Sequence, residues 1–317
     1  MVAAAAPWQP EGFGATASST RRRRPWRCRP WRRASASRRC GALEGFDAAG
    51  ARALLGEATR DVTVVLVRGY LGNLMRGNLV PARDALRAIG VDAFIARNRA
   101  GGTVADNARM IGDAVRRRLA GTRRRLVFGG HSKGGLESLQ VLADDPAGLG
   151  ARTAAVILSQ TPRGPSRVLE SLLSGAHAAT LGPRRRWAER AQRAGLWALG
   201  ARAGGLELTG ARLPALVARI DRTSAAVPRS FRLVQTASWS SRPTVWLDSF
   251  HERLGEIRPG VAHDGQFYLE DLLWPGVEHV LLPHLDHAQP VMDGFGFDSA
   301  RYWLAMLALV LEPRVAA

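Results

Sequence analysis

Unbroken apolar runs alternate along most of the chain with segments in which apolar residues recur at helical spacing. Such runs are typical of strands buried on both faces of a sheet. The pattern predicts strands at 61–67, 91–95, 125–129, 153–158, 231–237 and 276–282. It predicts helices at about 79–89, 103–119, 136–142 and 299–311. Because strands and helices alternate, we expect an α/β fold with a doubly wound, mostly parallel sheet and right-handed crossovers.

Residues 163–230 interrupt this alternation. They read as several short helices separated by Gly and Pro. One interpretation is a helical lid, inserted at the carboxyl edge of the strands, where α/β sheets bind their ligands. The alternative is a helical layer that covers the sheet. We expect the lid, within a domain that spans residues 43–317.

The first 42 residues are rich in Ala, Arg, Pro and Ser and show no apolar periodicity. This composition predicts a disordered segment, because too little apolar surface is available to offset the chain entropy. An over-extended start, a targeting peptide and a polyanion-binding arm remain open. No clear secretory signal occurs, since no apolar stretch follows the arginines. The closing helix at 299–311 is apolar but too short to span a bilayer, so we expect no transmembrane segment. The compartment is cytoplasmic or undetermined.

The net charge of +18 is concentrated in two places. Residues 1–42 hold ten arginines and one acid, and residues 161–232 hold thirteen arginines and four acids, so the rest of the chain is neutral. A basic lid suggests peripheral contact with an anionic lipid surface. A GC-rich genome would produce the same preference for arginine, so we predict no specific nucleic-acid binding. Neither the cysteines (Cys28, Cys40) nor the histidine spacing indicates a metal site, and we expect no cofactor.

A serine lies between a predicted strand and a predicted helix. Residues 130–134 fit G-x-S-x-G, the nucleophile elbow, with further glycines at 129 and 135. The chemistry needs Ser132 on a strained turn with its hydroxyl exposed and small neighbours around it. The following helix start would offer an oxyanion the backbone N–H of Lys133. The alternative is a glycine-rich turn with an incidental serine.

A serine nucleophile requires a base and an acid that orients the base, and in this fold they follow in the order acid, then His. His287 lies in the loop after the last predicted strand, where the base is expected, and His284 is the alternative. Asp264 precedes Gly265, which permits a tight turn, and is our candidate acid. Asp248 is its rival, because the apolar residues 245–247 before it could form the end of a strand.

The second oxyanion donor should come from the loop after the first strong strand. Gly69 in this loop allows close approach of the backbone, and we predict the N–H of Tyr70 as the donor. An ordinary loop aromatic is the alternative interpretation of Tyr70.

These motifs resemble those of the α/β-hydrolases, and above all those of bacterial triacylglycerol lipases and related lipase-like esterases. The likeness covers roughly residues 60–295 and implies Tyr70 as the oxyanion residue, Ser132 as nucleophile, Asp264 as acid and His287 as base. Three departures bear on the substrate: Arg68 replaces a His, the 161–164 motif lacks its His, and Lys133 replaces the commoner Gln. The motifs that carry the resemblance are residues 67–72, 130–136, 160–164, 263–265 and 286–288.

The sequence therefore predicts a serine hydrolase of carboxylic esters, a lipase or esterase acting on acylglycerols or other apolar acyl esters through an acyl-enzyme. The same triad also serves acyltransferases, thioesterases and polyester depolymerases. A non-catalytic scaffold that binds polyanions is the alternative from another class. The sequence leaves the oligomeric state undetermined.

Overall fold

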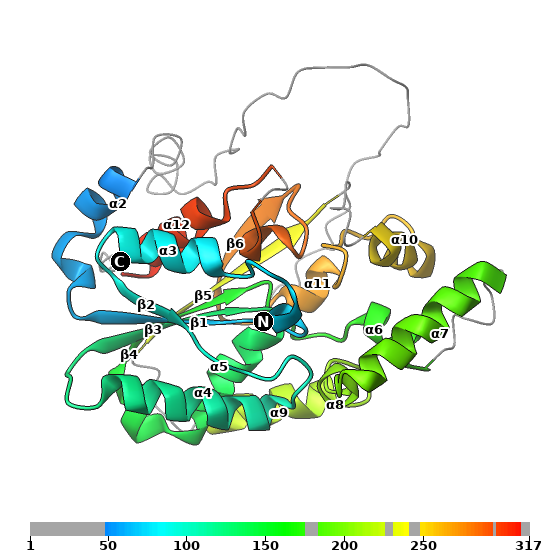
Figure 1. Ribbon diagram of the computed structural model, residues 1–317, viewed down its shortest axis with the longest axis horizontal. Coiled ribbons are helices and arrows are strands. Elements are labelled where there is room, and N and C mark those ends of the chain that lie inside the picture. The colour runs from blue at the N-terminus through cyan, green and yellow to red at the C-terminus, as the bar shows by residue number, and fades with distance from the viewer. Residues whose placement is uncertain (1–47, 175–182, 226–230, 241–247, 294–295, 312–317) are drawn as a thin grey trace, which may run out of the picture. The chain divides into compact units, whose positions relative to one another are not determined.

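A six-stranded sheet forms the centre of the computed structural model, which describes residues 48–174, 183–225, 231–240, 248–293 and 296–311 (Figure 1). All neighbouring strands run parallel in the order β2-β1-β3-β4-β5-β6. The strands are β1 (Val62–Val67), β2 (Asp92–Ile95), β3 (Arg125–His131), β4 (Thr153–Ser159), β5 (Arg232–Trp239) and β6 (Glu278–Pro283). The segment predicted to be disordered, residues 1–42, lies outside the described residues, as do both cysteines.

The predicted strands all occur, so the parallel α/β sheet expected from the apolar runs is confirmed. The strand β3 continues through two glycines to His131, beyond its predicted end. Register places Val67 beside Gly130, so the carboxyl end of β1 lies next to the start of the turn that carries Ser132. Because all strands are parallel, the loops that follow β1, β3, β5 and β6 meet at one edge of the sheet.

Helices cover both faces of the sheet (Figure 1). One face carries α2 (Ala48–Leu55), α3 (Val80–Ala88) and α12 (Ser299–Leu311), and the other carries α4 (Val104–Leu119), α5 (Lys133–Asp144) and α9 (Leu213–Ala225). The helix α4 is capped by Thr103, whose hydroxyl accepts a hydrogen bond from the Asp106 N–H at 3.1 Å. Short helical segments also occur, three of them 3-10 helices and η3 a π-helix: η1 (Gly56–Thr59), η2 (Gly72–Leu74), η3 (Pro146–Gly150) and η5 (Gln289–Val291).

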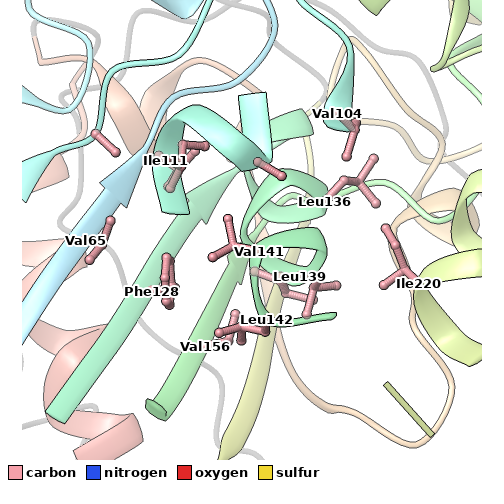
Figure 2. Packing of buried hydrophobic residues seen from close by; sticks show 14 of the residues in the cluster. Val65, Val104, Ile111, Phe128, Leu136, Leu139, Val141, Leu142, Val156 and Ile220 are labelled. Atoms are coloured by element: carbon pink, nitrogen blue, oxygen red, sulfur yellow. The ribbon is translucent and has the colours of Figure 1, made fainter. Parts of the chain in front are cut away.

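The main core lies between the sheet and the α4–α5 layer (Figure 2). Phe128 of β3 is fully buried there and belongs to the same cluster as Leu136 and Leu139 of α5. Burial of each such side chain contributes roughly 1.5–3 kcal/mol to folding. This packing fixes the direction of α5, and with it the helix end that follows Ser132.

The inserted segment contains α6 (Arg167–Ser174), α7 (Pro183–Ala198), α8 (Arg202–Leu206) and α9. The helix α9 packs on α5 and buries Ile220 in the main core, so the interpretation as a sheet-covering layer describes this part of the segment. The helices α6, α7 and α8 lie toward the carboxyl ends of the strands, together with α10 (Asp248–Ile257) and α11 (Leu269–Leu272) (Figure 1). Among the described helices, none has both the length and the apolar character needed to cross a membrane.

Candidate active site

Ser132 lies alone between the end of β3 and the start of α5, on a strained turn. Its backbone has φ 53° and ψ −127°, a conformation that costs a non-glycine residue on the order of 1–3 kcal/mol. The turn is held because the Ser132 N–H donates to Ser159 O at 2.8 Å and the Gly135 N–H donates to Ser132 O at 3.0 Å. The strain is therefore maintained by the strand on one side and by the helix on the other.

The glycines around Ser132 lie where no side chain fits. A Cβ on Gly130 would lie 2.5 Å from Gly135 Cα, and one on Gly134 would lie 2.4 Å from Val67 O. A Cβ on Gly135 would lie 1.9 Å from Thr161 Oγ1. The close approach of β1, β3 and α5 at this point thus accounts for the glycine pattern.

Asp264 and His287, which are far apart in the sequence, are in direct contact. The ring Nδ1 of His287 donates to Asp264 Oδ2 at 2.7 Å. The other oxygen, Oδ1, accepts from the N–H groups of Gln266 and Phe267 at 2.8 and 2.9 Å. Gly265 makes this tight turn possible with φ 95°. The carboxylate is fully buried and its orientation is fixed, as an acid that orients a histidine requires.

The backbone and ring of His287 are also fixed. Its N–H donates to Asp264 O at 2.9 Å, and its carbonyl oxygen accepts from His131 Nε2 at 2.8 Å. The rings of Phe267 and His131 lie 5.4 and 4.8 Å from the His287 ring, measured between centroids. Burial lowers the pKa of His131 to about 3, so His131 is neutral and adds no positive charge beside His287.

Gln160 and His131 had no predicted role, although both lie within the motifs 130–136 and 160–164. Gln160, with φ 48°, donates from Nε2 to Asp286 O at 2.9 Å, and its Oε1 lies 3.2 Å from His131 Nε2. These contacts hold the loop that carries His287 against the end of β4. The Asp286 carboxylate accepts from the Ala288 N–H at 2.8 Å, so it shapes the loop and does not orient the His287 ring.

The rival base, His284, does not join this group. His284 lies exposed in the same loop, and the described contacts give it no bond to Asp264. Asp248 is the first residue of α10, and its side chain lies outside the described part of the structure. Where side chains are described, no three His, Cys, Asp or Glu residues gather as a metal ion would require.

The site is nearly closed to solvent. Ser132 is 5 % exposed and His287 is 8 % exposed, so little of either residue reaches solvent in this conformation. The surrounding loops pack directly on the turn, which a strand-and-helix pattern does not reveal. Among the described residues, the Ser132 hydroxyl forms no hydrogen bond, so its bond to His287 is not made here. Such bonds are often long in the absence of substrate.

The loop that carries Tyr70 lies against Ser132. A Cβ on Gly69 would lie 2.9 Å from Ser132 Cβ, so Gly69 permits the close approach of the backbone. The Tyr70 ring turns away from the turn toward the insert, where its hydroxyl donates to Ala201 O at 2.8 Å. Burial raises the pKa of this phenol to about 12, so it remains neutral. Lys133 begins α5, where backbone N–H groups lack partners within the helix.

The arrangement was compared with known proteins. No family model and no curated protein sequence matches the chain. Among solved structures, the metagenomic carboxyl esterase MGS0156 is similar with a TM-score of 0.56 and 21% identity, covering 80% of this chain and 76% of that one. The mature Bacillus licheniformis lipase BlEst2 has a TM-score of 0.54 and 16% identity, covering 78% of this chain and 91% of that one. This chain has the α/β-hydrolase fold.

The Legionella pneumophila phospholipase PlaB is similar to the same α/β-hydrolase domain, with a TM-score of 0.53 and 13% identity. The match covers 80% of this chain and 60% of PlaB. At such low identity the comparisons establish the fold alone, because one α/β-hydrolase scaffold supports many reactions. The roles of Ser132, Asp264 and His287 therefore rest on their chemistry and geometry in this chain.

Proposed function

We propose that this α/β-hydrolase is a serine hydrolase that cleaves carboxylic esters through an acyl-enzyme. The observation that carries the proposal is the 2.7 Å bond between His287 and a buried Asp264, with the His287 ring packed beside the strained turn at Ser132. Two of the similar structures are described as an esterase and a lipase, which agrees with this proposal.

In the proposed reaction, His287 Nε2 accepts the proton of Ser132 as Oγ attacks the ester carbonyl carbon. The bond from Nδ1 to Asp264 holds the required tautomer and stabilises the imidazolium. The N–H groups of Lys133 and Tyr70 stabilise the oxyanion of the tetrahedral intermediate. His287 then protonates the leaving alcohol, and water releases the acid by the reverse sequence of proton transfers.

The insert supports a substrate with an apolar acyl group at a lipid surface. On α7, Trp187 and Trp197 are 74% and 71% exposed, and Arg186 and Arg190 are also exposed. The helix α7 is anchored to the domain, because the buried Glu189 pairs with Arg253 of α10. Exposed tryptophans among arginines are suited to the interface of a membrane that carries anionic lipid. We therefore propose that α7 is part of a lid that favours anionic lipid surfaces.

Acyl transfer, thioester cleavage and polyester cleavage use the same triad, and they differ in the acceptor or in the leaving group. Purified protein assayed on ester, thioester and polyester substrates of varied acyl length would separate them. We expect the highest kcat/KM for apolar carboxylic esters with water as acceptor. Faster transfer of the acyl group to an added alcohol than to water would instead identify an acyltransferase.

A fluorophosphonate probe tests the serine mechanism directly. We expect the probe to label Ser132 in the native protein, and we expect Ser132→Ala and His287→Ala to abolish labelling. The matched control is His284→Ala, an exposed histidine on the same loop, which should label as the native protein does. An unlabelled native protein would contradict the enzyme and support the polyanion-binding scaffold.

A further inference from the structure

Lys133 is the only lysine in the sequence, and every other one of the 45 basic residues is an arginine. Its side chain is 1% exposed, although it directly follows Ser132. The Nζ group donates to Glu137 Oε1 at 2.6 Å and to Gly102 O at 2.7 Å. The one ammonium group that the side chains provide is thus enclosed in the protein, one residue from the proposed nucleophile.

The partner carboxylate is just as buried and receives several hydrogen bonds. Glu137 is 1% exposed, and its oxygens accept from Asn107 Nδ2 at 2.7 Å and from Asn98 Nδ2 at 2.8 Å. Burial raises the pKa of Glu137, while Lys133 and the two amides act in the opposite direction. A buried ion pair is stable only when its remaining lone pairs and protons are satisfied in this way.

The buried pair is connected to the loops that border the site. Asn98 also donates to Arg68 O at 2.9 Å, within the loop that leads into Gly69 and Tyr70. The Lys133 Nζ group donates to Gly102 O. The side-chain amide of Asn107 binds the backbone of Arg99 twice: Oδ1 accepts from the Arg99 N–H at 2.8 Å, and Nδ2 donates to Arg99 O at 3.0 Å. The loop after β1, the loop after β2 and the start of α5 therefore converge on one carboxylate.

The insert rests on the same loop. The Gly204 N–H of α8 donates to Gly101 O at 2.9 Å. A Cβ on Gly101 would lie 2.0 Å from Ala201 Cα, so the two backbones are in contact. The position of the loop after β2, which Lys133 and Asn107 set, thus also sets where α8 packs.

We propose that Lys133, Glu137 and Asn98 are positioning residues that hold the backbone of the 68–70 loop at the distance from the Ser132 turn that transition-state binding requires. This inference rests on the proposed function, because it names the support of the proposed oxyanion site. A compact ammonium suits the position better than a guanidinium. The Nζ group lies 2.6 Å from Glu137 Oε1 and 2.7 Å from Gly102 O in a side chain that is 1% exposed, and a guanidinium is larger and planar.

The first experiment breaks the link between the carboxylate and the loop without removing the ion pair. We expect Asn98→Ala to lower kcat about ten- to a hundredfold with little change in KM, because misplaced donors weaken transition-state binding. Lys133→Met and Glu137→Gln should each act in the same direction. The Lys133→Met/Glu137→Gln double variant should lose less in kcat than the two single variants combined, because it leaves no unpaired buried charge.

The matched control is Leu142→Ala, which removes a buried side chain from the same helix at its far end. We expect it to lower the melting temperature as the other variants do and to leave kcat unchanged. If Asn98→Ala and Leu142→Ala had equal kcat after similar losses of stability, the positioning role would be wrong. Failure of the native protein to react with fluorophosphonate would instead contradict the proposed function itself.

A second measurement needs no variant that could fail to fold. Because Lys133 is the only lysine, protein labelled with ¹⁵N-lysine gives a single side-chain amino resonance. We expect this resonance to exchange slowly with water and to shift when fluorophosphonate modifies Ser132. Rapid exchange, or a resonance that modification leaves unmoved, would contradict the proposal even if every variant were inactive.

Discussion

Gly69 determines, at the scale of a single residue, how closely the proposed oxyanion loop approaches the nucleophile. A Cβ at this position would lie 2.9 Å from Ser132 Cβ and 3.0 Å from His131 O. Neither neighbour is the far end of a flexible side chain, so the loop itself has to move. Glycine is therefore required at this position for a geometric reason.

We expect Gly69→Ala to lower kcat about a hundredfold, because a displacement of about 1 Å has that effect on aligned donors. Initial rates on a soluble ester measure the loss. Gly255→Ala serves as the control, since a Cβ at that helical position meets no atom within 4 Å. Equal kcat for both variants would show that the Gly69 backbone does not support the reaction.

The residues of the candidate site were predictable to different degrees. The turn at Ser132 has a local sequence pattern, His287 follows the apolar run of the last strand, and Asp264 precedes a glycine that permits a tight turn. The roles of His131 and Gln160 depend on bonds to residues 287 and 286, more than a hundred positions away, and such bonds leave no local pattern. Glu137 stands four residues after Lys133 on one helix face, so the i,i+4 spacing could have indicated the pair.

At the scale of elements, α7 differs most from the sequence-based expectation. It is a 16-residue helix in a segment where several short helices were expected. Its apolar residues do not all lie on the buried face, because the tryptophans Trp187 and Trp197 are exposed to solvent. The helix therefore lacks a regular amphipathic pattern. The strands were easier to predict, since burial on both faces makes them continuous apolar runs.

We expect the Trp187→Ala/Trp197→Ala double variant to lose about tenfold or more in rate on vesicles with anionic lipid, since each ring contributes buried apolar area at the interface. The rate on a short soluble ester should not change. The control is Leu281→Ala, which removes a 38% exposed apolar side chain from β6. If the double variant kept its full rate on these vesicles, contact between α7 and the lipid surface would be wrong.

At the scale of the whole molecule, alternation of strands and helices was enough to predict the parallel sheet. The crossover rules then leave few arrangements of neighbouring strands. The placement of the insert was not predictable in the same way. Where α8 packs depends on backbone contacts with Gly101, and where α9 packs depends on its match to α5. Those are properties of surfaces assembled from distant segments, so they appear only in the folded chain.

Acid should destabilise the folded molecule through His131. Its pKa is about 3 when folded, below the ordinary value of 6.5, because burial disfavours the cation and His287 adds to the effect, while Gln160 and Asp264 oppose it. The unfolded chain therefore binds the proton more readily, and stability is lost as the pH falls below 6.5. Between pH 7 and pH 5 this histidine alone should lower the free energy of unfolding by about 2 kcal/mol.

Urea unfolding of the native protein and of His131→Gln at both pH values measures this effect. The variant removes the titration and keeps an amide that can donate to His287 O. His263, whose pKa burial lowers to about 4, and Asp271, whose pKa burial raises to about 6, act in opposite directions on acid stability. Both residues are present in the two proteins, so their contributions cancel in the comparison. We expect the loss between pH 7 and pH 5 to be about 2 kcal/mol smaller in the variant. An equal loss in both proteins would mean that His131 is not held neutral by the fold.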